Sequence, residues 1–160
     1  MAKKIVIVGA LGYLGTELCR LYSGESWFNK IVAIDSRFLS DRVAQLSNWN
    51  IEFHQGHVLD QIFLKNVLDG ADVVHHLAGV TDVAYVKKES NSEQDDKIKK
   101  VAIEGTKNVI NAMPEKAKII FPSTHVIYEG LKETKNDITE EDDPKPVLES
   151  LNSLSTGATK

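Results

Sequence analysis

Short runs of apolar, mostly β-branched residues alternate along the chain with longer segments of mixed polarity. The apolar runs are residues 5–8, 31–34, 51–53, 72–77 and 117–121. Runs without regular polar alternation are typical of strands that are buried on both faces of a parallel sheet. A helical pattern covers residues 13–23, 60–69 and 92–112, and a poorer one covers residues 37–49. This order predicts a right-handed α/β fold with a doubly wound, mostly parallel sheet.

The pattern changes after residue 128, where the chain becomes nearly all polar. Pro144 and Pro146 exclude a continuous helix in this segment. A doubly wound sheet normally continues beyond a fifth strand, whereas the strand pattern here stops. We therefore expect one domain over residues 1–146, followed by an unfinished or truncated tail over residues 147–160.

Composition narrows the classes of partner. The 160 residues are 42% hydrophobic and 26% charged, with a net charge of -4, which gives no general attraction to nucleic acid or anionic lipid. Cys19 is the single cysteine, so an internal disulfide and a thiolate metal cluster are excluded. No apolar run approaches the roughly 18 residues of a membrane span, and the N-terminus does not resemble a signal peptide. We expect a cytoplasmic protein without a metal site.

Gly9, Gly12 and Gly15 lie directly between the first predicted strand and the first predicted helix. Glycines at this spacing allow a tight turn in which backbone N–H groups approach a pyrophosphate, and the helix N-terminus adds free donors. Asp35 ends the second strand, where a carboxylate binds a ribose diol and repels a 2′-phosphate. The spacing therefore favours NAD over NADP, although Arg37 could meet a 2′-phosphate. A tight turn that binds nothing is the alternative.

His75 and His76 are adjacent on the fourth predicted strand. Successive side chains of a strand point to opposite faces, so these two cannot chelate one metal ion. We expect one of them in the core and the other packed against a helix.

Four further stretches carry recognisable motifs. They are residues 56–60, 72–80, 101–109 and 121–129. Together with the glycine loop, they resemble the extended short-chain dehydrogenase/reductase family, the NAD-dependent epimerases and dehydratases of nucleotide sugars. Order and spacing agree from residue 4 to about residue 146. The resemblance implies an NAD(P)-binding Rossmann fold, and an activity in which bound NAD takes a hydride from a sugar carbon and later returns it.

The resemblance implies that the cofactor lies along the carboxyl ends of the strands. The glycine loop would bind the pyrophosphate. The end of the second strand would bind the ribose, and the loop after the third strand would bind the adenine. Small residues after the fourth strand would leave room for the cofactor. These positions are Gly9, Gly12, Tyr13, Leu14, Gly15, Asp35, Ser36, Arg37, His57, Val58, Leu77, Ala78 and Gly79. His57 departs from the family, which usually has an Asp there for the adenine amino group.

The resemblance places catalysis at the end of the fifth strand. Thr124 falls where the family has a Ser or Thr that hydrogen-bonds the substrate hydroxyl, and Ser123 lies beside it. The family also uses Tyr-x-x-x-Lys, in which the tyrosine is the base. Here Lys160 is preceded by Thr156 at that spacing, and a threonine cannot replace the tyrosine. We therefore expect cofactor binding with little or no turnover from these 160 residues, because the base and the sugar-binding lobe are missing.

Two other functions stay open. Ala102 replaces the usual Asn of the 101–109 motif, which favours a non-catalytic dinucleotide-binding sensor module. Alternatively, His57, Ala102 and Pro122 mark a Rossmann-like fold that has lost its nucleotide. In the family the corresponding helices form a dimer's four-helix bundle, so the segment 92–112 implies a possible homodimer. Besides a nucleotide sugar, we expect no nucleic-acid or membrane partner.

Overall fold

The computed structural model describes residues 2–79, 92–123, 128, 139 and 141. The chain divides into two compact units. The first contains residues 1–78 and 104–122, and the second contains residues 79–103 and 123–160. The first unit carries the sheet. The expected tail over residues 147–160 lies outside the described residues.

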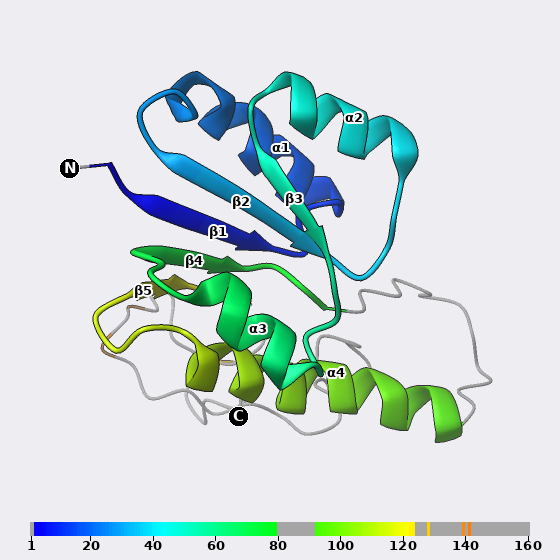
Figure 1. The fold of residues 1–160 in the computed structure, drawn as a ribbon. Coiled ribbons are helices and arrows are strands. Elements are labelled where there is room, and N and C mark those ends of the chain that lie inside the picture. Colours follow the sequence, from blue (N-terminus) through cyan, green and yellow to red (C-terminus); the bar gives the residue numbers. More distant parts are fainter. Residues whose placement is uncertain (1, 80–91, 124–127, 129–138, 140, 142–160) are drawn as a thin grey trace. The chain divides into compact units, whose positions relative to one another are not determined.

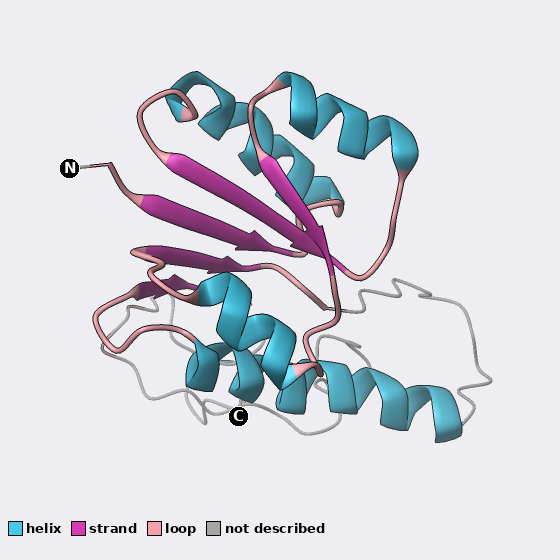
Figure 2. Cartoon of the chain, in the orientation of Figure 1, coloured by secondary structure: helices cyan, strands magenta, loops and turns pink. Residues whose placement is uncertain are grey.

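Strands and helices alternate as the sequence predicts, with a short 3-10 turn, η1, after the first helix (Figures 1 and 2). The elements are β1 (Lys4–Val8), α1 (Tyr13–Tyr22), η1 (Ser23–Glu25), β2 (Lys30–Asp35), α2 (Ser40–Asn48), β3 (Glu52–Gln55), α3 (Gln61–Leu68), β4 (Val73–His76), α4 (Ser92–Ala112) and β5 (Lys118–Ile120). The poorly patterned segment 37–49 thus does contain a helix, α2, in which Leu46 is buried.

The five strands form one sheet in the order β3-β2-β1-β4-β5, and all paired neighbours are parallel. Figure 1 shows α1 and α2 on one face of the sheet and α3 on the other. This confirms the predicted doubly wound, Rossmann-type α/β fold. The strand order reverses between β1 and β4, and such a switch point is where open parallel sheets bind ligands, at the carboxyl ends of the strands.

The central strands explain the unbroken apolar runs. Val6, Ile7 and Val8 of β1 are at most 1% exposed, because helices cover both faces. The weaker third run is displaced in the structure, because Ile51 is buried just before the strand. β3 itself is partly exposed and lies at the end of the described strand order, where it pairs with β2. Within the described part of the chain, no helix has the length and apolarity that a membrane crossing requires.

The two adjacent histidines of β4 face opposite sides of the sheet, as predicted. His75 Nε2 lies 2.9 Å from the Tyr22 hydroxyl of α1, and His76 Nε2 lies 2.9 Å from the Thr106 hydroxyl of α4. His76 is 1% exposed, and its Nδ1 has no hydrogen-bond partner among the described residues. Burial lowers the pKa of His75, and it lowers the pKa of His76 from 6.5 to about 4. Both rings are therefore neutral packing groups at pH 7.

His76 makes the stability of the fold dependent on pH. Its pKa is lower in the folded chain than in the unfolded chain, so the unfolded chain binds the extra proton, and stability is lost as the pH falls from about 7 towards 4. Between pH 7.5 and 5.5 we expect His76 to account for about 1 kcal/mol of lost stability. Urea unfolding at the two pH values should show a smaller loss for His76→Gln than for the wild type. His57→Gln, which replaces an exposed histidine, is the control, and an unchanged pH dependence in His76→Gln would contradict this assignment.

Candidate functional site

The glycine loop leaves β1 in a conformation that requires glycine at its first position. Gly9 has a φ of 89°, and a Cβ there would lie 2.6 Å from the backbone nitrogen of Ala78 and 2.8 Å from the carbonyl carbon of Leu77. A Cβ on Gly15 would lie 2.3 Å from the Gly9 carbonyl oxygen. The two glycines therefore let the loop pass between the segment after β4 and the first turn of α1.

The first turn of α1 presents free hydrogen-bond donors. Gly12 is the N-cap residue, and no side chain caps the helix or places a negative charge in its first turn. None of the described residues accepts a hydrogen bond from the backbone N–H groups of Tyr13, Leu14 or Gly15. Unpaired N–H groups and the positive end of the helix dipole bind anions, phosphates above all. The sequence assigns the N–H groups of Gly12, Tyr13 and Leu14 to a pyrophosphate. Those of Tyr13 and Leu14 are free, whereas the Gly12 N–H donates to the Gly9 carbonyl at 3.2 Å.

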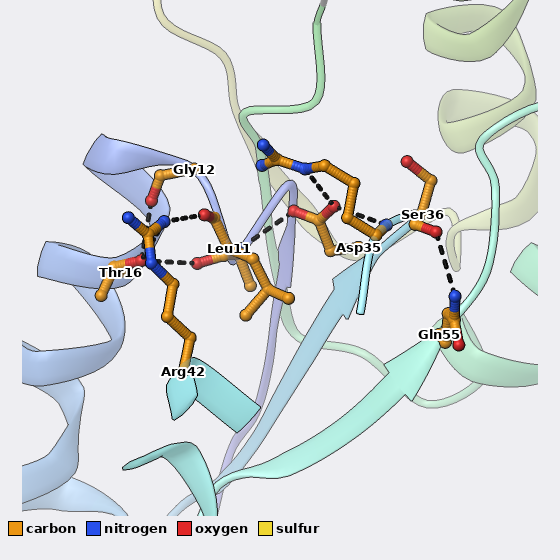
Figure 3. Close-up of polar contacts among 9 residues, drawn as sticks. Leu11, Gly12, Thr16, Asp35, Ser36, Arg42 and Gln55 are labelled. Atoms are coloured by element: carbon orange, nitrogen blue, oxygen red, sulfur yellow. Dashed lines mark hydrogen bonds and ion pairs between the residues drawn. The ribbon is translucent and has the colours of Figure 1, made fainter. Parts of the chain in front are cut away.

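Asp35 holds the loop from the end of β2. Its Oδ2 accepts a 2.9 Å hydrogen bond from the backbone N–H of Leu11, and the Asp35 side chain is 6% exposed (Figure 3). Its Oδ1 accepts from the backbone N–H of Arg37 at 3.0 Å and from Arg37 Nε at 3.3 Å. The carboxylate thus has a structural task beyond the ribose binding that the sequence assigns to it. Ser36, which follows, is exposed, and its carbonyl accepts from Gln55 Nε2 at 3.2 Å.

The carbonyl of Leu11 is held by a residue that the sequence analysis missed. Arg42, from α2, donates through Nη1 to this carbonyl oxygen, and the same atom lies 3.5 Å from Thr16 Oγ1 (Figure 3). The Thr16 hydroxyl donates in turn to the Gly12 carbonyl at 2.8 Å. A basic residue at a helix start resembles any surface arginine in sequence, so no signal could have identified this contact.

The loop after β3 is fixed from α4. Val58 is 6% exposed, and its carbonyl accepts a 3.1 Å hydrogen bond from Asn108 Nδ2. The Oδ1 of Asn108 accepts a second hydrogen bond, from Gln61 Nε2 at 3.0 Å. A Cβ on Gly105 would lie 2.6 Å from Val58 Cγ2, so that glycine makes room for Val58. Asn108 was not singled out in sequence, because its partner is a backbone carbonyl.

His57 has its ring oriented by its own loop. The backbone N–H of Leu59 donates to His57 Nδ1 at 3.1 Å, so Nδ1 is an acceptor and the proton of the neutral ring lies on Nε2. The ring is exposed and offers an N–H donor, whereas the family's Asp offers an acceptor at this position. The departure noted in the sequence therefore changes the direction of the hydrogen bond that this position can make with a base.

The first unit brings together most of the predicted cofactor residues. The loop glycines, Tyr13, Leu14, Asp35, Ser36 and Arg37 lie with Leu77 and Ala78 at the carboxyl ends of β1, β2 and β4, and His57 and Val58 follow β3. Gly79 and Ser123 are exposed and belong to the second unit. Thr124, Thr156 and Lys160 lie outside the described residues.

Comparison with known families agrees with this geometry. The sequence profile of the 3-beta hydroxysteroid dehydrogenase/isomerase family matches residues 6–152. The chain belongs to this family. The 3-beta hydroxysteroid dehydrogenase/isomerase family is part of the extended short-chain dehydrogenases/reductases, so the resemblance seen in the sequence motifs is confirmed.

Individual relatives of this family member are longer than the chain. Uncharacterized protein 052L of Frog virus 3 (isolate Goorha) is 33% identical over 110 residues, which is 67% of this chain and 28% of that protein. The dTDP-D-glucose 4,6-dehydratase of Dictyostelium discoideum is 25% identical over 166 residues, which is 96% of this chain and 37% of that protein. The chain therefore spans about a third of the length of these curated relatives.

Solved structures share the fold. The UDP-Glc/GlcNAc 4-epimerase of Campylobacter jejuni superposes with a TM-score of 0.74 at 20% identity, over 98% of this chain and 47% of that one. A UDP-glucuronic acid 4-epimerase variant of Bacillus cereus superposes with a TM-score of 0.72 at 23% identity, over 96% of this chain and 49% of that one. At these identities the likeness shows the fold alone.

Gly9 should not tolerate a side chain. Because an alanine there would need a positive φ and would overlap the backbone of Ala78, we expect Gly9→Ala to lower the free energy of unfolding by about 2 kcal/mol or more. Gly24→Ala is the matched control, since a Cβ on Gly24 meets nothing within 4 Å. Urea unfolding of both variants measures the difference. Equal stability of the two variants would show that the close passage at Ala78 is not a constraint.

Proposed function

We propose that this chain is the NAD-binding part of a nucleotide-sugar epimerase or dehydratase. The observation that carries the proposal is the set of free N–H donors at the start of α1, which lies beside Asp35 at the switch point of the sheet. Family membership supports it. So do the relatives: the Dictyostelium protein is a dTDP-D-glucose 4,6-dehydratase, and the Bacillus cereus structure is a complex with NAD and a fluorinated UDP-glucuronic acid.

The residues present fit a dinucleotide. The loop backbone and the N-terminus of α1 would hold the pyrophosphate, while Val58 would line the adenine pocket with the His57 Nε2–H as a donor to a ring nitrogen. Leu77 and Ala78 would bound the cofactor beside β4. When bound, NAD supplies a reversible hydride acceptor for a sugar carbon. Thr124 would hydrogen-bond the sugar hydroxyl, with Ser123 beside it, just past the end of β5.

Asp35 supports a preference for NAD over NADP. A carboxylate has about four acceptor sites, and Asp35 uses three of them, for the Leu11 N–H and for two donors of Arg37. No donor among the described residues takes the fourth site, which is left for a ribose hydroxyl. A 2′-phosphate would instead meet the carboxylate charge, and the Arg37 guanidinium, which could attract it, is already paired with Asp35.

NAD should stabilise the purified chain, and NADP should do so much less. A ligand at 100 times its Kd adds about 2.7 kcal/mol to the stability of the folded state, which a thermal-shift titration detects. In Asp35→Asn we expect NAD affinity to fall about tenfold and the preference over NADP to narrow, because the charge that repels the 2′-phosphate is gone. Asp69→Asn is the control, because Asp69 is an exposed carboxylate that precedes β4, at the amino ends of the strands. Failure of every dinucleotide to shift the melting temperature would refute the proposed function.

We extend the proposal to a homodimer formed through α4. Ile103 and Ile110 are 48% and 52% exposed, and residues seven apart share one face of a helix, whereas Val109 is fully buried in the core. These two isoleucines, with the exposed Lys107 between them on the same face, form the surface that we propose a second copy covers.

Light scattering after size-exclusion chromatography measures the mass in solution. We expect a dimer for the wild type and a monomer for Ile110→Glu, because a buried unpaired carboxylate would oppose association. Ile62→Glu changes an exposed isoleucine of α3 in the same way and should leave the mass unchanged. A monomeric wild type would exclude this contact.

A further inference from the structure

We propose that Arg42 is a positioning residue for the glycine loop, and that cofactor affinity depends on it although it need not touch the cofactor. This inference rests on the proposed NAD binding. Arg42 lies in the first turn of α2, a helix with a poor sequence pattern, and it reaches across to the loop that follows β1.

The two peptide groups that flank the Leu11 Cα are each hydrogen-bonded to a different side chain. The Leu11 N–H donates to Asp35 Oδ2 at 2.9 Å, and the Leu11 carbonyl accepts from Arg42 Nη1 (Figure 3). Hydrogen bonds to charged groups are the stronger class in proteins, and both of these have a charged partner. Leu11 itself is 1% exposed, so neither backbone group could exchange its partner for water without cost. The orientation of this part of the loop is thereby fixed by two side chains of different elements.

The N–H groups of Tyr13, Leu14 and Gly15 are free because α1 begins directly before them. Gly12 is the N-cap residue, and its carbonyl accepts the first hydrogen bond of the helix, from the Thr16 N–H at 2.9 Å. The three N–H groups in between therefore have no helical carbonyl to bond. Arg42 holds the Leu11 carbonyl, which belongs to the peptide group that leads into this N-cap residue. It thereby fixes the segment from which the free donors start.

Thr16 completes the contact. Its hydroxyl donates to the Gly12 carbonyl at 2.8 Å, so a lone pair of the oxygen is left to face Arg42 Nη1 at 3.5 Å. The guanidinium is partly buried between α2 and the loop rather than directed into solvent. A solvated arginine that merely adds positive charge to the surface would not have these partners.

The test compares Arg42→Met with Arg20→Met. Methionine keeps most of the apolar stem and removes the donors, and Arg20 is an exposed arginine of α1 whose side chain pairs with Glu17. We expect Arg42→Met to weaken NAD binding about tenfold, and Arg20→Met to leave it unchanged. Adenosine, which has no phosphate to meet the loop, should bind both variants and the wild type with the same affinity in an NMR titration. Arg42→Lys replaces Arg42→Met if the latter does not fold.

Salt separates the positioning role from a simple charge effect. An electrostatic field at the pyrophosphate is screened at about 0.5 M salt, whereas a misplaced loop is not restored by salt. The ratio of wild-type to variant affinity should therefore stay the same at low and high salt. A ratio that falls to one at high salt, an equal loss of adenosine binding, or unchanged NAD binding would each overturn the proposal.

Failure of the proposed function gives a different result. If the wild type binds no dinucleotide, the cofactor part of the inference falls with that function. The contact itself is then judged by amide hydrogen exchange at Leu11 in the ligand-free chain. Faster exchange in Arg42→Met than in Arg20→Met keeps Arg42 as the residue that positions the loop, and equal exchange removes it.

Discussion

The close passage of the glycine loop against the segment after β4 is the constraint on which the site depends. β1 lies between β2 and β4, so the chain that leaves β1 must turn within a narrow space bounded by the Ile34 carbonyl and the Ala78 backbone. The N–H groups of Gly9 and Ala10 both donate to the Ile34 carbonyl, at 2.8 Å and 3.0 Å. A residue with a Cβ would overlap the Ala78 backbone in this turn, and α1 begins four residues after it, at Tyr13.

Two loops of the site, the one after β1 and the one after β3, are each fixed by a side chain that donates to a backbone carbonyl. Asn108 holds the Val58 carbonyl, as Arg42 holds that of Leu11. In both cases a helix that is distant in sequence fixes a loop at the carboxyl edge of the sheet. Such loops carry ligands in this fold, and they gain affinity when their shape is set before the ligand arrives, because less ordering is needed on binding.

The sequence predicted the parts of the structure whose signals are local. Alternating runs predicted the parallel sheet, the glycine spacing predicted the turn at Gly9, and adjacency on one strand predicted that His75 and His76 face opposite ways. It could not predict the contacts of Arg42 and Asn108. Each donates to a main-chain carbonyl, and every residue type has such a carbonyl, so the partner leaves no mark in the sequence. It also underestimated α2, because a nine-residue helix with Leu46 as its buried residue shows little periodicity.

Asp35 links the shape of the loop to the choice of cofactor. The spacing after Gly15 indicated a ribose ligand, yet in the folded chain the carboxylate already accepts the Leu11 N–H and pairs with Arg37. One side chain therefore serves both the fold and the proposed binding. A change of cofactor preference made at Asp35 would also release the loop, whereas a change at Arg37 would alter the charge near the ribose and leave the Leu11 bond in place. Arg37 is thus the position at which the proposed preference between dinucleotides can change while the hydrogen bond from the Leu11 N–H to Asp35 stays in place.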